Sequence, residues 1–159
     1  MDQNRPSKEF IISLFYHFAR LVTAFVFIYA SLDKQCNPWA FAQAVYNYQV
    51  LPDALINLTA LILPWLELIL GFCLLLERWM MGASGLAAVL MTVFIGLILF
   101  NLARGLDISC GCFSTDPAEG PADKLTLLRD TLFLILAMGL VALTFHRKTL
   151  HYKNPLQSV

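Results

Sequence analysis

Two cysteines separated by a single residue, Cys110 and Cys112, are the sharpest chemical feature of the sequence. Two thiols with one glycine between them, Gly111, can close a small strained ring, and strain makes a disulfide easier to reduce. Glycine also allows backbone conformations that a larger side chain forbids. The pair is therefore typical of a dithiol that exchanges oxidising equivalents with a partner.

A third thiol, Cys36, could act with this pair as a resolving or relay cysteine. Two other interpretations stay open, because Cys36 could form a static bridge with Cys110 or Cys112, or the three thiolates could hold zinc or copper(I). We expect the redox pair and no metal. The fourth cysteine, Cys73, stands in an apolar run, where cysteine commonly behaves as a small apolar residue.

The elements that carry these thiols must lie in a membrane. Of the 159 residues, 58% are hydrophobic and only 14% are charged, and the mean hydropathy is +0.67. A soluble domain carries about a quarter charged residues, so this chain cannot cover a water-facing surface. The 11 basic and 11 acidic residues balance, which gives no support to a nucleic-acid partner.

Four apolar stretches are long enough to cross a bilayer, which takes about 20 helical residues. They cover residues 10–32, 54–76, 80–103 and 125–145. The sequence predicts an all-α integral membrane protein: one transmembrane domain, 1–159, built as a four-helix bundle. A cleaved signal peptide is the competing interpretation of the first stretch, but its length and its internal Arg20 favour a retained span.

Two longer connections, 33–53 and 104–124, carry three of the thiols. After the first span, Asn37 is a plausible N-cap and Pro38 a first-turn proline, and Phe41, Val45 and Tyr48 share one helical face. This pattern predicts a short helix in the membrane interface, with an aromatic-rich loop as the alternative. The second connection is rich in glycine and proline and should be irregular.

Basic residues predict the orientation of the chain, because cytoplasmic connections are enriched in them. Both termini are therefore expected in the cytoplasm of a bacterial inner membrane, with the multi-pass chain presenting both longer connections to the periplasm. Thiols there meet an oxidising compartment. Six basic residues lie in the tails and the short hairpin, against three in the longer connections: Arg5, Lys8, Arg78, Arg147, Lys148 and Lys153, against Lys34, Arg104 and Lys124.

Charged residues inside the spans are the second feature of the sequence that indicates a functional or structural site. Arg20 and Glu67 both fall near the middle of their predicted spans, where an unpaired charge is costly, so we expect them to form an ion pair. His17 lies one turn before Arg20 and could join it. Such a pair could fix helix packing or serve catalysis or a cofactor. Arg129 and Asp130 open the fourth span and are expected to meet lipid headgroups, although they could instead anchor the connection that carries Cys110 and Cys112.

Four segments of the chain resemble the methylamine utilisation protein MauE branch of the DoxX-like membrane family. The resemblance covers most of the chain, and its most specific part is the Cys-Gly-Cys-Phe motif. Two positions depart from the pattern, Ser114 and the extra thiol Cys36. The segments are Arg20–Lys34, Asn37–Pro52, Pro64–Glu67 with Gly71, and Arg104–Gly105 followed by Cys110–Phe113.

This resemblance implies a membrane thiol–disulfide redox protein, an oxidoreductase in character, that works with a periplasmic thioredoxin-like or disulfide-containing protein. Its role would be disulfide formation in, or electron relay to, exported proteins. A quinone is a candidate acceptor by analogy with other four-helix redox bundles, although no cofactor motif is evident. The alternative is a non-enzymatic assembly factor or transporter subunit, with a structural disulfide or metal-binding cysteines.

Overall fold

The computed structural model describes residues 5–105 and 124–153, and every regular element in this part of the chain is an α-helix. Five helices follow one another along it: α1 (Arg5–Cys36), α2 (Pro38–Asn47), α3 (Asp53–Leu75), α4 (Met80–Ala103) and α5 (Lys124–Lys153). The predicted all-α class is therefore confirmed. Cys110 and Cys112 lie outside the described residues.

Four of these helices are long and apolar enough to cross a membrane, as the sequence predicts. The spans are Phe10–Cys36, Asp53–Leu75, Met80–Ala103 and Leu125–Thr149. The second and third spans match the predicted ranges to within one residue, and the fourth ends four residues later than predicted. The first continues four residues past the predicted end at residue 32, and this extension moves Lys34 from a loop into a helix.

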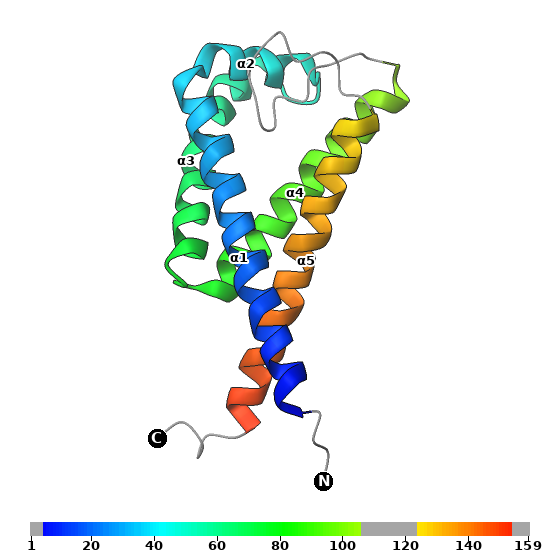
Figure 1. Cartoon of the computed structure of the whole chain (residues 1–159). Coiled ribbons are helices and arrows are strands. Elements are labelled where there is room, and N and C mark those ends of the chain that lie inside the picture. The colour runs from blue at the N-terminus through cyan, green and yellow to red at the C-terminus, as the bar shows by residue number, and fades with distance from the viewer. Residues whose placement is uncertain (1–4, 106–123, 154–159) are drawn as a thin grey trace.

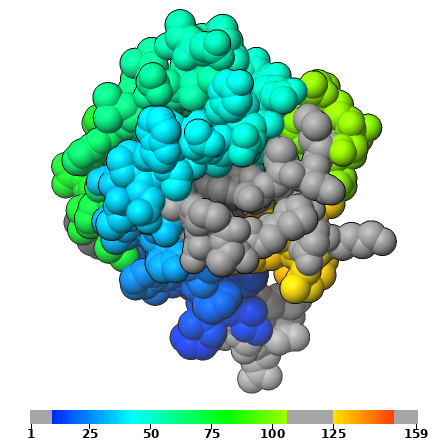
Figure 2. Space-filling view, turned by 90° about the horizontal axis from the view of Figure 1, so that it is seen from above, coloured from blue at the N-terminus to red at the C-terminus, as the bar shows by residue number. Residues whose placement is uncertain are grey.

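The long helices form two packed pairs, α1 with α3 and α4 with α5, and further contacts join α1 to α5 and α3 to α4. Helix α1 begins and α5 ends at the same end of the bundle, which we call the terminal end (Figure 1). Helix α2 crosses the opposite end, which we call the α2 end. Figure 2, seen from that end, shows α2 and the residues after it spread beside the end of α4.

Small residues let the helices of the bundle approach closely. A side chain on Gly71 of α3 would place its Cβ 2.6 Å from Cγ1 of Ile28 and 3.2 Å from the carbonyl oxygen of Ala24, both in α1. Such contacts drive helix association in membranes, where apolar side chains gain little by leaving lipid. Large apolar side chains cover much of the exterior instead, for example Phe25, Ile69 and Ile135.

Helix α2 confirms the predicted short helix after the first span, although it ends at Asn47. Asn37 stands at the N-cap position without a side-chain capping bond, and Pro38 opens the first turn as expected. The buried face consists of Phe41, Ala44 and Tyr48, so Ala44 takes the place predicted for Val45. Because α2 packs on α3, this face closes the α2 end of the bundle.

Candidate functional site

Cys36, the last residue of α1, is an exposed free thiol at the α2 end. The helices that flank residues 106–123 meet the same end, since α4 ends and α5 begins there (Figure 1). Cys73 is a half-buried free thiol in α3 and packs against the apolar core, which agrees with its expected apolar behaviour.

A buried ion pair joins α1 to α3 below α2. Nζ of Lys34 donates to both carboxylate oxygens of Glu67, at 2.7 and 2.8 Å, and the two side chains are 1% and 4% exposed. The ammonium also lies 5.2 Å from the ring centroids of Phe41 and Phe94, which stabilise a cation through their π faces. A buried charge needs such compensation, because lipid and protein solvate it poorly.

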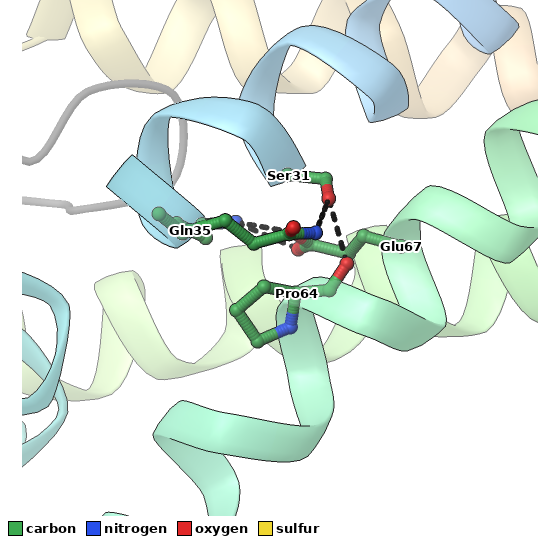
Figure 3. A network of polar contacts seen from close by, with 5 residues as sticks. Ser31, Gln35, Pro64 and Glu67 are labelled. Atoms are coloured by element: carbon green, nitrogen blue, oxygen red, sulfur yellow. Dashed lines mark hydrogen bonds and ion pairs between the residues drawn. The ribbon is translucent and has the colours of Figure 1, made fainter. Parts of the chain in front are cut away.

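Neutral polar groups brace this ion pair, as Figure 3 shows. Oγ of Ser31 donates to the carbonyl oxygen of Pro64 at 2.7 Å, and Nε2 of Gln35 donates to the same Oγ at 2.9 Å. The contact fixes α1 against the turn of α3 that precedes Glu67. A polar contact between helices is worth about 0.6 kcal/mol in a membrane, so the brace serves geometry as much as stability.

Asp130 of α5 lies on the other side of the same interior. Its side chain is buried, and Nε of Arg129 donates to its Oδ1 at 3.1 Å. Glu67 and Asp130 both line one small cavity of about 20 Å³ between the two helix pairs. The remaining lining is apolar: Val26, Phe27, Ala30, Met91, Phe94 and Ile95.

Tyr48, the C-cap residue of α2, is buried near Asp130. Burial of the phenol, together with the nearby charge of Asp130, raises the pKa of Tyr48 well above its usual value. The hydroxyl therefore keeps its proton at any physiological pH and can serve only as a neutral donor or acceptor. We call Lys34, Tyr48, Glu67 and Asp130 the buried polar cluster. It can hold charge, position a water and exchange protons.

The predicted ion pair between Arg20 and Glu67 is wrong. Nη1 of Arg20 binds Oε1 of Glu77 at 2.9 Å, whereas Glu67 binds Lys34. Because α1 and α3 run antiparallel, Arg20 lies level with the turn after α3. Glu67 precedes Glu77 by about ten residues, or about 15 Å along a helix, which is beyond the reach of an arginine side chain.

His17 lies apart from both ion pairs. Its side chain is exposed, and its ring meets the edge of the Tyr16 ring, with 5.3 Å between centroids. The ring of Tyr16 is in turn covered by the guanidinium of Arg147, 4.2 Å from the ring centroid. The contact expected between His17 and Arg20 is therefore replaced by one with Tyr16.

Sequence reasoning missed two members of the cluster, Lys34 and Asp130. The helical pattern carried a signal for both. Lys34 falls on the face of α1 that also buries Phe27 and Ala30. Asp130 lies about two, three and four turns before residues that are also buried, namely Ala137, Leu140 and Thr144. The expectation that Asp130 meets lipid headgroups is thus wrong.

No metal site is evident in the described part of the chain. Within residues 5–105 and 124–153, no group of three or more His, Cys, Asp and Glu side chains lies close enough together to hold a metal ion. The interpretation of three thiolates as metal ligands depends on Cys110 and Cys112, which lie outside that part.

Comparison with known proteins identifies relatives. The chain is 32% identical over 122 residues to the methylamine utilization protein MauE of Paracoccus denitrificans, which covers 76% of this chain and 65% of that protein. It is 38% identical over 96 residues to the protein of the same name from Methylophilus methylotrophus, covering 60% and 50% of the two chains. The MauE of Methylorubrum extorquens is 35% identical over 127 residues, covering 77% and 66%.

The chain thus spans between half and about two thirds of the length of these curated relatives. No solved structure matches it. The sequence pattern of the family described as methylamine utilisation protein MauE matches residues 12–143, a range that includes the buried polar cluster, the second and third spans and most of the first and fourth. This protein is a multi-pass membrane protein that belongs to the MauE family.

Proposed function

We propose that this protein carries out thiol–disulfide exchange at the α2 end of its membrane bundle, with Cys110 and Cys112 as the active pair and Cys36 as a relay thiol. The supporting observation is topological. Cys36 is exposed at that end, and both helices that flank residues 106–123 meet the same end (Figure 1). Cys36 and the segment that carries Cys110 and Cys112 are therefore attached to the same end of the bundle.

The proposed step is a balanced exchange with a disulfide of a partner protein. A thiolate of the pair attacks one sulfur of the partner's disulfide, forms a mixed disulfide and releases a partner thiolate. The second thiol of the pair then attacks the mixed disulfide, which closes the Cys110–Cys112 bridge and frees the partner's second thiolate. The partner is reduced by two electrons and the pair is oxidised by two, and the reverse sequence oxidises the partner.

The names of the relatives suggest the physiological setting. We propose that the protein is an accessory membrane protein of methylamine utilisation, and that its partner is an exported, disulfide-containing or thioredoxin-like protein. Trapping tests this proposal, because Cys112→Ser removes the resolving thiol and should leave Cys110 in a mixed disulfide. The captured protein identifies the partner, and capture that persists in a Cys110→Ser variant would contradict the assignment of the attacking thiol.

Redox titration tests the chemistry directly. We would equilibrate the purified protein in glutathione buffers of graded potential and follow thiol alkylation by mass. The expected result is a reversible two-electron change above about −300 mV, the range of labile disulfides. Cys110→Ser and Cys112→Ser should abolish it, whereas the control Cys73→Ser should leave it unchanged.

Other outcomes of this titration would replace the proposal. A bridge from Cys36 that only strong reductant opens would indicate a structural crosslink and an assembly role. Zinc or copper that copurifies with the wild type and is lost from the cysteine variants would indicate a metal site. Thiols that stay reduced in every buffer would exclude the exchange reaction.

We also propose an orientation of the chain in the membrane, with both termini in the cytoplasm and the α2 end facing the periplasm. An impermeant maleimide should then label Cys36 in reduced intact cells and leave Cys73 unlabelled, because Cys73 is partly buried within a span. A cysteine introduced after residue 153 should label only after the cells are opened. Labelling of that tail in intact cells would reverse the orientation.

A further inference from the structure

Two acidic residues from opposite helix pairs line the same small cavity. Glu67 reaches the cavity from the pair α1–α3, and Asp130 reaches it from the pair α4–α5. Both residues are almost wholly buried, at 3% and 2% exposed. Carboxylates so placed repel each other and lose hydration, and a single proton held between them relieves both costs.

Among the described residues, four charged or titratable side chains lie close to these two carboxylates. Lys34 of α1 binds Glu67, and Arg129 of α5 binds Asp130 while its own side chain stays 39% exposed. Tyr48 of α2 lies within the electrostatic reach of Asp130. Helix α4 lines the cavity only with Met91, Phe94 and Ile95. Asp33, next to Lys34 on α1, is a further acid among the described residues, and it is half-exposed.

The two cations differ in how firmly they are held. Lys34 is enclosed and makes two short bonds to Glu67, so its charge cannot leave the cluster. The side chain of Arg129 is 39% exposed and donates to Asp130, its neighbour in the chain. Because its counter-charge reaches the exterior, Asp130 is the carboxylate at which we expect the proton to bind first, whereas Glu67 stays bound to Lys34.

The cavity has room for one water molecule. Its volume of about 20 Å³ exceeds the roughly 10–15 Å³ that a single water requires. Glu67 and Asp130 supply polar partners on its two sides, and such partners are what distinguish a hydrated cavity from a dry one. A water here can connect the carboxylates that the two helix pairs contribute.

We propose that Glu67 and Asp130 share one exchangeable proton through a water in this cavity, which makes the interior of the bundle a proton-binding site. On uptake, one proton from the aqueous phase at the α2 end converts one carboxylate into a carboxylic acid. Its O–H donates to the water, and the water donates to the other carboxylate. Lys34 and Arg129 keep their protons throughout, so the net charge of the site rises by one.

Infrared difference spectroscopy in lipid nanodiscs tests the proposal independently of any thiol chemistry. Spectra taken across a pH step should contain one carboxylic-acid C=O band that shifts in D₂O. Both Glu67→Gln and Asp130→Asn should lose this band completely, because each leaves a single carboxylate beside its own cation. The control Glu77→Gln removes an ion-paired carboxylate that is 44% exposed and should leave the band intact.

A cavity-filling variant keeps the test decisive if Glu67→Gln does not fold. Ala30→Val retains both carboxyl groups but adds methyl groups to the cavity wall, so it should expel the water and abolish the shared band. A band that survives Asp130→Asn or Ala30→Val would overturn the shared proton. So would the absence of any such band from the wild-type protein.

Discussion

The two ion pairs of α1 lie at opposite ends of the bundle and differ most in their access to water. At the α2 end, Lys34 and Glu67 are 1% and 4% exposed, and two aromatic rings and a polar brace surround them. At the terminal end, Arg20 and Glu77 are 13% and 44% exposed, and Glu77 belongs to a turn. Water can replace the partner of Glu77 but not the partner of Glu67. The pair Arg20–Glu77 can therefore be broken at low cost, whereas the pair Lys34–Glu67 cannot.

Replacing the basic residue of each pair should give the largest difference in stability between the two ends. Lys34→Met leaves Glu67 as an uncompensated buried charge and should lower the free energy of unfolding by about 3–5 kcal/mol. Arg20→Met leaves Glu77 in contact with water and should cost about 1 kcal/mol or less. Unfolding in mixed micelles of rising SDS content measures both.

A second variant separates the charge from the packing. Adding Glu67→Gln to Lys34→Met removes the stranded charge, so the double variant should recover part of the lost stability. If the double variant loses as much as the two single variants combined, the ion pair does not contribute as the distances indicate. Equal losses from Lys34→Met and Arg20→Met would remove the distinction between the two ends.

The sequence predicts the spans well because span formation depends on length and composition alone. An apolar run of this length has few alternatives to a membrane helix, and the turn at residues 77–79 is too short for anything but a hairpin. Pairing of charges depends instead on helix register. Arg20 and Glu67 each lie mid-span, yet α1 extends to Cys36, which brings Lys34 rather than Arg20 to Glu67.

Rotation of a helix is equally hard to deduce from one sequence. Asp130 stands in the second turn of α5, where a carboxylate can face headgroups or the interior. Its helical spacing to Ala137 and Leu140 indicates the interior, but residues 132–143 of α5 are apolar all round, so the pattern is weak. The roles assigned to Cys110 and Cys112 stay predictions, because both residues lie outside the described part of the chain.

The next largest loss of stability is expected at Gly71, which lies in α3 between the two ion-paired residues Glu67 and Glu77. Gly71→Ala places a methyl group 2.6 Å from Cγ1 of Ile28 and 3.2 Å from two backbone atoms of α1, so α1 and α3 must separate. Overpacking of this kind costs about 1–3 kcal/mol. Gly85→Ala is the matched control, because no atom lies within 4 Å of its added methyl group.

The control should be neutral or slightly stabilising, since alanine is the better helix former. The same SDS titration measures the stability of both variants, with helix content followed by circular dichroism. If Gly71→Ala proves as harmless as Gly85→Ala, the close approach of α1 and α3 does not set the spacing on which the buried pair depends.

The α2 end should also respond to alkaline pH through Tyr48. Its pKa is raised in the folded protein, so the neutral phenol stabilises the fold below the usual tyrosine pKa, and this contribution falls as the pH rises above it. The unfolded chain then loses a proton that the folded chain keeps. The slope is at most about 1.4 kcal/mol per pH unit.

Tyr48→Phe removes this titration and should flatten the alkaline loss of stability relative to the wild type. Tyr46→Phe is the matched control, because Tyr46 belongs to the same helix but is exposed. Unfolding at a series of alkaline pH values measures the difference. Identical alkaline slopes in the two variants would contradict the burial of Tyr48 beside Asp130.

The smallest expected effect compares the turns at the two ends. Gln49 near the α2 end and Glu77 near the terminal end both adopt left-handed backbone conformations, with φ of 50° and 55°, which favour glycine. Gln49→Gly gives up only a 3.4 Å contact with Arg104 and should gain about 0.5–1 kcal/mol. Glu77→Gly gains the same backbone relief but loses the ion pair with Arg20. The gap between the two variants therefore measures that exposed pair, and it should be below about 1 kcal/mol. A gap as large as the loss in Lys34→Met would mean that the terminal end holds its charges as tightly as the α2 end.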